Sequence, residues 1–565
     1  MRHNERRMPE TVLVLGSGPI RIGQGIEFDY SCVHCVWALE KLGYRAIILN
    51  NNPETVSTDF DTGDGLYFEP VTLSDVRKVV EHEDVMGVVC QFGGQTAINL
   101  AEGLAQHGIP VLGTSHEAIG RAEDRSQFDD MLEKLGIARP RGKGVHSIDE
   151  AIEVAREVGY PVLVRPSFVL GGRAMEICYN EEMLRTFYAE AEQANEGQPV
   201  LVDQYLLGKE AEVDVISDGV DTLLPGIMEH IERAGVHSGD SMAVYPPISL
   251  SVDVQAQMCL AASKIARELK IKGLMNIQFV IVDSPNGPVA TVLEVNPRAS
   301  RTVPYLSKIT GIPMVDLATH CMMGRTLAEA GYGSGLWKLI PSEQEKAHGE
   351  LIPEAVLARG DISRPEPVLY AVKAPVFSFQ KLRLVEPSLG PEMKSTGEIM
   401  GVDFTYEAAL YKALIASGLT FKKSGSVLLS VQDADKPTAI AMARELTSQG
   451  YTILATSGTL DALKDAGVEA KWVMKIHEGE PNLLDSIHAG EVSLMINTPS
   501  QNAVAEKEAA LIRRACIETG VACITSIDTA QALVKALPYF ADPSQTSCCR
   551  LEEYFAGSPR SANVR

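Results

Sequence analysis

The sequence predicts an α/β protein with two doubly wound parallel sheets, one near each end of the chain, and an α+β region between them. Short apolar β-type runs alternate with helical patterns from residue 11 and again from residue 424, which is typical of parallel sheets. Between these regions, strand runs are joined by turns rich in glycine and proline. The 565 residues exceed what one hydrophobic core accommodates, so three or four domains are expected.

The first predicted sheet ends near Arg121. The first strand leads into the loop 16–30, in which Arg21 occupies the position that a dinucleotide fingerprint gives to its third glycine. The second strand ends in Asn50 rather than in an acidic residue. We therefore expect a tightly packed turn, or a contact with a partner domain, instead of an NAD site. The strands of this sheet are expected at residues 11–16, 45–50, 87–94 and 109–114.

The middle of the chain continues with a helix, a strand at 160–167, a glycine-rich hairpin and further strands. Residues 331–368 are richer in glycine, proline and charge, which indicates an insertion or surface excursion. Strand character returns at 369–379, and a helical connector is expected at 404–417. The last predicted sheet has strands at 427–431, 452–456, 472–475 and 493–497.

Composition excludes several classes of function. A net charge of −23 disfavours nucleic acid as a partner, because phosphate backbones are held by basic surfaces. No apolar run approaches the roughly 20 residues of a membrane span, and the basic start lacks the apolar core of a secretory signal. We therefore expect a cytoplasmic protein with no membrane partner. Cys32 and Cys35 lie in an apolar helical segment without a second ligand pair, which favours reduced buried thiols over zinc or redox chemistry.

The most informative segment for function lies between Gln278 and Arg301. Two apolar runs flank the turn S-P-N-G-P and predict a β-hairpin centred on Asn286. Gln278 and Glu294 are equidistant from that centre and are expected to face each other. Asn296 shares the face of Glu294, because side chains two positions apart on a strand point the same way.

These three side chains suggest a metal site. Gln278, Glu294 and Asn296 offer oxygen ligands with little charge, which suit Mg²⁺ bound together with water and nucleotide phosphates. Arg298 and Arg301 follow directly. The alternative for an isolated E-x-N pattern is a charged strand end at the surface.

Two further segments are candidates for nucleotide contacts. In R-P-S-F-V-L-G-G-R, a strand delivers Arg165, and the paired Gly171 and Gly172 would let backbone N–H groups approach phosphate oxygens. Residues 226–241 crowd three acids and two histidines around a glycine-flanked V-H-S turn. So many polar groups are costly to bury unless a ligand or ion satisfies them, the alternative being a solvated loop.

The chain resembles the large subunit of carbamoyl phosphate synthetase, and in particular its C-terminal, carbamate-phosphorylating half. The resemblance rests on strings that occur in the family's order over residues 11–420: GQGIEFDY, NNNPETVSTDFDT, QFGGQTAINLA, GYPVLVRPSFVLGGRAMEI, GIMEHIERAGVHSGDS and LEVNPRASRTVPYLSK. Residues 424–540 resemble the family's methylglyoxal-synthase-like regulatory domain. The family's N-terminal half, which makes carbamate from bicarbonate, is not among the 565 residues.

The resemblance implies a domain plan. It comprises a pre-ATP-grasp domain at 1–121, an ATP-grasp domain at 122–385 with the insertion at 331–368, a connector at 386–423, an allosteric domain at 424–545 and a tail at 546–565.

It also implies roles for residues at matching positions. Two metal ions, Mg²⁺ or Mn²⁺, would bind at Gln278, Glu294 and Asn296, the first two of which also touch ATP. Arg298 and Arg301, with Glu294, would act at the reacting phosphoryl group and carbamate. The remaining positions implied to bind ATP are Arg125, Arg165, Gly171, Gly172, Leu206, Glu210, Gly235, Val236, His237 and Ser238.

The last domain is expected to hold a nucleotide effector, UMP or IMP. The implied phosphate contacts lie at strand ends and helix N-termini. Pro499 replaces a threonine contact of enteric members, and Ala374 replaces a glutamate of the ornithine-activated enzymes, although Glu232 and Asp240 are kept. The effector positions are Lys436, Thr456, Thr459, Lys475 and Asn497.

The implied activity is phosphorylation of carbamate by ATP, in arginine or pyrimidine biosynthesis. The expected partners are the N-terminal synthetase half, as a separate chain, and a glutaminase small subunit. The alternatives are a homodimer that performs both phosphorylations, another ATP-grasp ligase working through carboxyphosphate, and a non-catalytic regulatory subunit.

Overall fold

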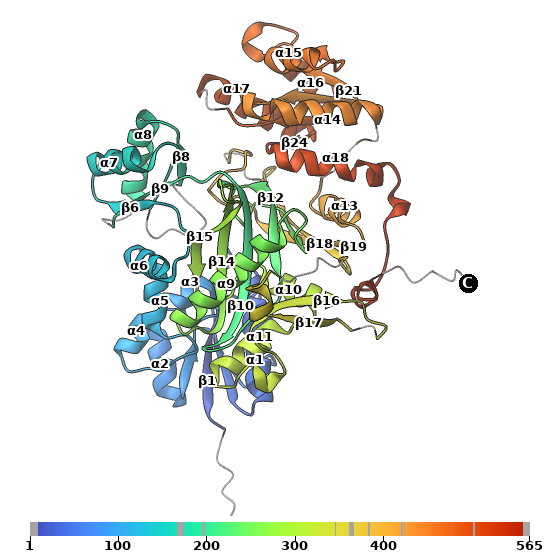
Figure 1. The fold of residues 1–565 in the computed structure, drawn as a ribbon. Coiled ribbons are helices and arrows are strands. Elements are labelled where there is room, and N and C mark those ends of the chain that lie inside the picture. Colours follow the sequence, from blue (N-terminus) through green and yellow to red (C-terminus); the bar gives the residue numbers. More distant parts are fainter. Residues whose placement is uncertain are drawn as a thin grey trace, which may run out of the picture. The chain divides into compact units, whose positions relative to one another are not determined.

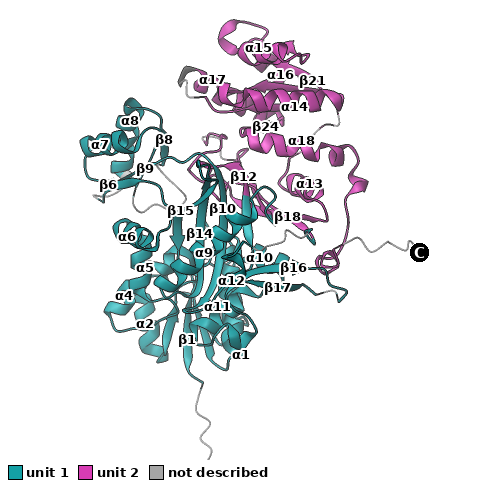
Figure 2. Ribbon diagram, in the orientation of Figure 1, with its two compact units in different colours: residues 1–170, 174–229, 245–368 teal, residues 171–173, 230–244, 369–565 magenta. Residues whose placement is uncertain are grey.

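The computed structural model describes residues 9–166, 175–194, 198–344, 346–360, 366–381, 385–419, 422, 424–500 and 503–557. The chain forms two compact units (Figure 2), and each is described by itself. Unit 1 contains residues 1–170, 174–229 and 245–368, and unit 2 contains 171–173, 230–244 and 369–565. Within the described ranges, no helix is both long and apolar enough to cross a membrane.

Unit 1 begins with a parallel five-stranded sheet, as predicted (Figure 1). Its order is β3-β2-β1-β4-β5, and apolar strands buried on both faces explain the continuous hydrophobic runs. β5 is shorter than predicted. The strands are β1 (Thr11–Leu15), β2 (Arg45–Leu49), β3 (Gly65–Tyr67), β4 (Gly87–Val89) and β5 (Val111–Leu112). The helices are α1 (Glu27–Lys41), α2 (Leu73–Glu83), α3 (Gly94–Ile98) and α4 (Ala101–Gln106), with a 3₁₀ turn at Val56–Thr58.

Helix α1 contains Cys32 and Cys35, both buried and unoxidised. Burial raises the pKa of the Cys35 thiol to about 12. The pair is therefore part of the apolar packing, as the sequence indicated.

A four-stranded antiparallel sheet follows, in the order β6-β9-β7-β8. Its core packs against two helices whose apolar residues recur at helical spacing. The glycine-rich hairpin, with Gly171 and Gly172, lies outside the described residues. The strands are β6 (Gly142–Val145), β7 (Val162–Pro166), β8 (Glu176–Cys178) and β9 (Val200–Gln204). The neighbouring helices are α5 (His116–Glu123), α6 (Arg125–Leu135), α7 (Ile148–Val158) and α8 (Glu181–Ala194).

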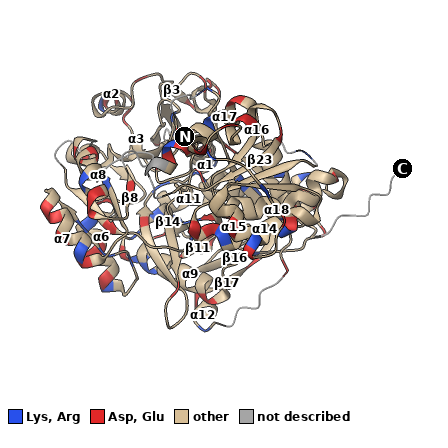
Figure 3. Ribbon diagram, turned by 90° about the horizontal axis from the view of Figure 1, so that it is seen from above, with Lys and Arg blue, Asp and Glu red and all other residues tan. Residues whose placement is uncertain are grey.

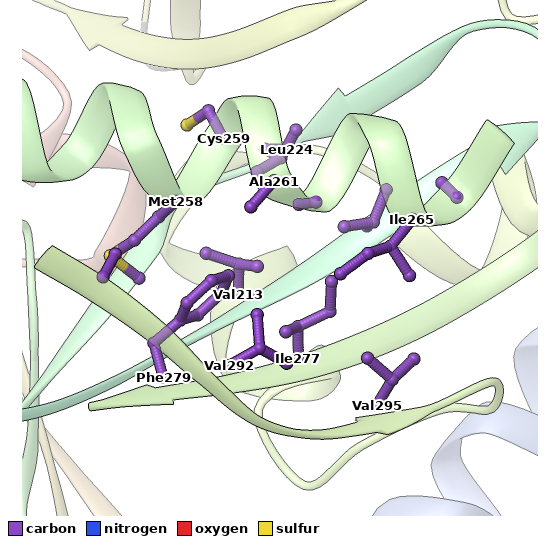
Figure 4. Packing of buried hydrophobic residues seen from close by; sticks show 14 of the residues in the cluster. Val213, Leu224, Met258, Cys259, Ala261, Ile265, Ile277, Phe279, Val292 and Val295 are labelled. Atoms are coloured by element: carbon purple, nitrogen blue, oxygen red, sulfur yellow. The ribbon is translucent and has the colours of Figure 1, made fainter. Parts of the chain in front are cut away.

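The large sheet of unit 1 is built around β10 (Lys209–Asp218), β14 (Lys272–Val282) and β15 (Val289–Asn296), which pair antiparallel. Helix α9 (Val252–Glu268) covers one face, where Figure 4 shows its side chains over those of the strands. The strand residues on this face are apolar, including Val213, Ile277, Phe279, Val292 and Val295. Alternation therefore directs the intervening polar side chains to the opposite face.

The expectation of a surface excursion at 331–368 is not what the structure shows. β16 (Gly335–Ile340) pairs in parallel with β11 (Thr222–Leu224), and β17 (His348–Pro353) pairs with β16. Leu336, Leu339 and Leu357 are buried. The glycine and charge of this stretch concealed the few apolar residues that it buries. Three helices complete this region: α10 (Val303–Thr310), α11 (Met314–Met322) and α12 (Glu354–Leu357).

Unit 2 contains the end of β12 (Ile227–Arg233), β13 (Ala243–Tyr245), β18 (Tyr370–Val376) and β19 (Gly397–Asp403). The predicted connector is α13 (Tyr406–Ala416), which packs closely on β19. A Cβ at Gly401 would lie 2.2 Å from Ala409 O, so only glycine permits this approach.

The C-terminal sheet is parallel, with the order β22-β21-β20-β23-β24. β22 overlaps the strand predicted at 472–475 only at Trp472. The strands are β20 (Ser426–Ser430), β21 (Thr452–Ala455), β22 (Lys471–Trp472), β23 (Val492–Asn497) and β24 (Ala522–Ile524). The helices are α14 (Lys436–Ser448), α15 (Ser457–Asp465), α16 (Leu483–His488), α17 (Ala503–Thr519), α18 (Ile527–Ala541) and α19 (Leu551–Tyr554). Within unit 2, Tyr411 of α13 stacks edge-on against Phe540 of α18. The predicted α/β fold class is confirmed.

Candidate functional site

The predicted hairpin places Gln278 opposite Glu294 and Asn276 opposite Asn296. Asn296 Nδ2 donates a hydrogen bond to Glu294 Oε1 at 3.0 Å. The three predicted ligands are therefore neighbours on one face of β14 and β15. We call this the polar face.

The hairpin is not symmetric about Asn286, however. Near the turn Phe279 pairs with Val292, and a β-bulge then separates this pair from Gln278 and Glu294. Leu293 is the extra residue. Without the bulge, Glu294 would lie on the same face as Val292, under α9, so the bulge is what directs the carboxylate to the polar face.

β10 extends the polar face with residues that the sequence reasoning missed, apart from Glu210. Glu212 pairs with Gln278, and Asp214 with Asn276. The Asn276 amide donates to Glu212 Oε2 at 3.1 Å and to Asp214 Oδ1 at 3.2 Å. Alternating acids in a long strand could have indicated them, but only the register connects them to the hairpin.

Asp214 is the most perturbed acid of this face. It is completely buried, and burial, reinforced by the Glu212 carboxylate, raises its pKa to about 6. Hydrogen bonds from Thr302 Oγ1 and Asn276 hold its oxygens. The inner end of the polar face thus favours protonation of Asp214 more than water does, although a pKa of about 6 leaves it mostly ionised at neutral pH.

Arg298 and Arg301 leave the end of β15 in different directions. Arg298 Nη2 donates to Asn296 Oδ1 at 3.2 Å, and its Nε donates to Gln95 Oε1 at 3.1 Å. Burial lowers the pKa of Arg298, which the Glu294 carboxylate opposes. Arg301 Nε is bonded to Glu27 Oε1 at 3.1 Å. The structure therefore joins Arg298 to the predicted ligands and Arg301 to the start of α1.

The polar face fits a hard divalent cation bound with a nucleotide. Gln278, Glu294 and Asn296 provide one carboxylate and two amide oxygens. Among the described residues, no group of three or more His, Cys, Asp or Glu side chains is arranged to hold a metal. With a single carboxylate in the predicted set, much of the metal affinity would come from the phosphates of a bound nucleotide.

Arg125 and Arg165 are brought together by one buried acid, Asp203. Arg125 Nη2 lies 2.7 Å from Asp203 Oδ1, and Arg165 Nε lies 3.5 Å from Asp203 Oδ2. Arg125 Nε and Arg139 Nη1 both approach Asp129, at 3.2 and 3.3 Å. Figure 3 shows both acidic and basic residues on α6. Arg139 Nη2 also lies 3.8 Å from Glu133 Oε2, so three arginines face three acids, and a bound anion would compete with these carboxylates for the arginines.

The remaining predicted ATP contacts of unit 1 are at the start of β10. Leu206 is half-buried in the segment after β9, and Glu210 is buried on the polar side of β10. A nucleoside site combines apolar surface with a few polar groups. Leu206 offers apolar surface of this kind, and Glu210 offers a carboxylate.

The predicted turn Gly235–Ser238 belongs to unit 2. Gly235 has φ 102°, a conformation that favours glycine. His237 N donates to Gly390 O at 2.8 Å, and Lys373 Nζ lies 3.5 Å from Ser238 O. Asp240 accepts hydrogen bonds from the backbone N–H groups of residues 394 and 395. The polar residues around the turn are thus satisfied by the protein, and the turn is rigidly held.

The five predicted effector residues gather at the carboxyl edge of the C-terminal sheet, where the strand order reverses between β20 and β23. Such edges bind ligands in open α/β sheets. Thr456 Oγ1 donates to Ser430 Oγ at 3.2 Å, and Asn497 Nδ2 donates to Ser430 O at 3.2 Å. Thr459 Oγ1 accepts from Val431 N at 3.3 Å.

Two lysines supply the charge at this edge. Lys436 Nζ is 2.6 Å from Asp433 Oδ1. The Lys436 ammonium, assisted by Lys475, lowers the pKa of the exposed Asp433 carboxyl. Both lysines therefore lie near the Asp433 carboxylate, and an anionic ligand would compete with Asp433 for them.

Arg513 is a residue of this edge that the sequence reasoning missed. It is fully buried, and its Nε donates to Asn497 Oδ1 at 2.8 Å. Its Nη1 bonds Glu506 and Glu386. Because Asn497 Oδ1 is occupied, the Asn497 amide presents its Nδ2 to the sheet edge. An arginine beside a second arginine in a charged stretch of helix gives no sequence signal of burial.

Three family models match the chain. The carbamoyl phosphate synthase preATP-grasp domain matches residues 8–121, and the carbamoyl-phosphate synthase L chain ATP binding domain matches residues 124–330. Together these two cover more than half of the chain. The MGS-like domain matches residues 438–525.

Several solved structures are similar to this chain at low sequence identity, and the first named below shares its fold. The biotin carboxylase domain of Hydrogenobacter thermophilus 2-oxoglutarate carboxylase is 19% identical, with a TM-score of 0.50 over 66% of this chain and 77% of that one. Biotin carboxylase from Campylobacter jejuni is 16% identical, with a TM-score of 0.48 over 65% and 76%. N5-carboxyaminoimidazole ribonucleotide synthetase from Thermotoga maritima is 16% identical, with a TM-score of 0.48 over 73% and 98%.

Proposed function

Because this chain belongs to the carbamoyl phosphate synthase large-chain family, we propose that it uses ATP to phosphorylate carbamate, giving carbamoyl phosphate and ADP. It is an ATP-grasp enzyme, and ATP with Mg²⁺ is its expected cofactor. The observation that carries the proposal is the polar face, on which Gln278, Glu294 and Asn296 are neighbours and Arg298 contacts Asn296.

The proposed reaction requires no protein nucleophile. A carbamate oxygen attacks the γ-phosphorus of ATP, the bond between that phosphorus and the β,γ-bridging oxygen breaks, and ADP leaves with the electron pair. The barrier is lowered by alignment of the two reactants and by neutralisation of phosphoryl charge. When bound, Mg²⁺ or Mn²⁺ would neutralise phosphate charge, held by Gln278, Glu294 and Asn296.

Arg298 is proposed to act on the transferred phosphoryl group. Its fixed hydrogen bonds to Gln95 and Asn296 orient the guanidinium before substrate binds. A preorganised cation needs little rearrangement as charge develops. Arg301, held by Glu27, is proposed to bind the carbamate carboxylate, and Arg125 and Arg165 the ATP phosphates.

The nucleotide itself is proposed to contact two other segments. Leu206 and Glu210 would receive the adenosine. Gly235, Val236, His237 and Ser238 would approach it through the rigidly held turn. Gly171 and Gly172, which lie outside the described residues, are proposed to contact the phosphates through their backbone N–H groups.

Carbamate decomposes readily in water, so it has to reach the site without passing through solvent. We propose that a second synthetase half makes it from bicarbonate and from ammonia released by a glutaminase subunit. UMP or IMP is proposed to bind at the carboxyl edge of the C-terminal sheet. Ala374 is buried within β18 and offers no carboxylate, so little response to ornithine is expected.

Two other functions remain as alternatives. The first is a ligase that makes carboxyphosphate for another acceptor, which the fold of the biotin carboxylase structures also permits. The second is a non-catalytic regulatory subunit. A non-catalytic subunit has no need of a preorganised arginine beside a carboxylate–amide set, and the presence of both in this chain favours the enzyme.

The test is ATP formation from MgADP and carbamoyl phosphate, the reverse reaction. Glu294→Gln should lower kcat by about 10²–10³, the usual cost of one electrostatic contact to the transition state. The control is Asp283→Asn, which makes the same acid-to-amide change at the turn end of the same hairpin and should leave the rate near wild type. A wild-type rate for Glu294→Gln would contradict the proposal.

A further inference from the structure

We propose that Arg233 is a positioning residue that couples the effector edge to the nucleotide-binding turn Gly235–Ser238. The inference rests on the proposed function, which assigns ATP to the turn and a nucleotide phosphate to the edge. All of the contacts below lie within unit 2.

Arg233 ends β12, two residues before Gly235. Its Nε donates to Asp528 Oδ2 at 2.7 Å and its Nη2 donates to Asp528 Oδ1 at 3.1 Å. The backbone N–H of Arg233 also donates to Asp528 Oδ2, at 3.3 Å. The guanidinium thus grips both oxygens of one carboxylate, a geometry that a lysine cannot reproduce.

The third nitrogen of the guanidinium reaches the effector edge. Arg233 Nη1 lies 3.4 Å from Asp435 Oδ1. Asp435 directly precedes Lys436, one of the two lysines of the edge, and is only 3% exposed. A buried carboxylate depends strongly on its partners, because water does not solvate it.

A short series of hydrogen bonds connects Asp435 to the end of β23. Gln432 Nε2 donates to Asp435 Oδ2 at 2.9 Å, and Gln432 N donates to Thr498 Oγ1 at 2.9 Å. Thr498 follows Asn497, a predicted effector contact. Four residues therefore link the effector edge to the turn through hydrogen bonds: Thr498, Gln432, Asp435 and Arg233.

The residue before Arg233 is held by the same helix start. Thr529 Oγ1 donates to Glu232 Oε1 at 2.5 Å, beside Asp528 in the first turn of α18. Met242 N donates to the other oxygen of Glu232 at 2.8 Å. The end of β12 is thus fixed by α18 on one side and by Asp435 on the other.

Competition between two carboxylates for one guanidinium gives the coupling its physical basis. Lys436 directly follows Asp435 and pairs with Asp433, so an anion bound at Lys436 adds negative charge close to the Asp435 carboxylate. The Asp435 carboxylate then interacts more strongly with the Arg233 guanidinium. The guanidinium therefore shifts its hydrogen bonding between Asp435 and Asp528. Because Arg233 is 45% exposed, salt screens this balance, so the coupling should weaken as ionic strength rises.

The test measures two dissociation constants on the full chain. One is that of a non-hydrolysable MgATP analogue, with and without saturating UMP or IMP, and the other is that of UMP or IMP alone. The wild type should show at least about a fivefold change in analogue affinity, the lower end of measured allosteric couplings. Arg233→Gln should reduce the change to less than about twofold while each ligand alone binds within about twofold of wild type.

Two matched variants separate coupling from loss of charge. Arg444→Gln removes the same charge from α14, where Arg444 Nη2 donates to the carbonyl of Ala466 at 2.7 Å, and should keep the full coupling. Arg233→Lys keeps the charge without the two-oxygen grip and should restore part of it. Full coupling in Arg233→Gln, or none in the wild type, would overturn the inference. Failure of the wild type to bind the MgATP analogue would instead overturn the proposed function, and the inference with it.

Discussion

The polar face of β10, β14 and β15 and the effector edge of the C-terminal sheet are both proposed to bind nucleotide phosphates, with opposite chemistry. The first is lined by carboxylates and amides, including Glu212, Asp214 and Glu294, and repels a bare phosphate. The second presents Lys436 and Lys475 beside hydroxyls and an amide. An oxygen-lined site needs a cation to bind a nucleotide, whereas a lysine-lined site does not.

Strand order alone does not produce this difference. The N-terminal and C-terminal parallel sheets have the same order, with the first strand in the centre and the reversal beside it. At the reversal, the first sheet carries amides: Asn50 Oδ1 accepts from Gly18 N at 3.0 Å, and Gln24 bonds Thr96. The second carries lysines. The side chains at the strand ends, and not the fold, are therefore the reason why only the second sheet is proposed to bind a phosphate.

Removal of divalent cations should separate the two sites most strongly. EDTA should weaken ATP binding by at least about 100-fold, because several kcal/mol of phosphate neutralisation is lost. UMP or IMP binding should change by less than about twofold, since lysines supply that charge. Calorimetric titration of each nucleotide, with and without Mg²⁺, measures both. An equal loss of affinity for ATP and for UMP or IMP on adding EDTA would contradict the difference proposed between the two sites.

Substitution of a lysine at the effector edge should weaken effector binding and leave ATP chemistry unchanged, with a smaller effect than removal of Mg²⁺. Lys475→Met should weaken UMP or IMP binding by about 10-fold, which corresponds to a hydrogen bond to a charged group. The kcat of ATP formation without effector should stay at the wild-type value. Lys471→Met, on β22 of the same sheet, is the control for loss of charge. Unchanged effector affinity in Lys475→Met would place the effector elsewhere.

The smallest expected effect concerns the buried acid of the polar face. Because burial raises the pKa of Asp214 from 3.8 to about 6, folding favours its protonated form. Its contribution to stability is complete below the unfolded pKa and falls as the pH rises through about 6. Between pH 5 and pH 8 this amounts to a loss of about 1–2 kcal/mol.

Asp214→Asn should remove that part of the pH dependence. Urea unfolding of wild type and variant at pH 5 and pH 8 gives the comparison, with Asp283→Asn as a control on an exposed acid-to-amide change. If both variants keep the wild-type difference between the two pH values, Asp214 does not titrate in this range.

Much of this arrangement was predictable from local patterns. The alternation of strands and helices gave both parallel sheets, and the turn S-P-N-G-P gave the hairpin. The opposition of Gln278 and Glu294 was predicted from symmetry about Asn286, but it arises from the bulge at Leu293. A bulge depends on packing against α9 and β10, which a single strand does not reveal.

Contacts between distant residues escaped the sequence reasoning for the same reason. Asp203 meets Arg125 across 78 residues, and Asp528 meets Arg233 across 295. Periodicity places each residue on its own element but does not say which elements meet. The dependence of β12 on α18 also implies that deleting residues from 424 onward would disturb the turn itself, so single substitutions test regulation more cleanly.

The central claim is tested most directly by the product formed from carbamate. The chain is mixed with MgATP and freshly prepared carbamate, and in parallel with bicarbonate and glutamine, and carbamoyl phosphate is followed by ³¹P NMR. We expect carbamoyl phosphate equal to the ADP formed in the first mixture, and no carbamoyl phosphate in the second. ADP and inorganic phosphate released with bicarbonate alone, without carbamoyl phosphate from carbamate, would contradict the claim and identify a carboxyphosphate-forming ligase.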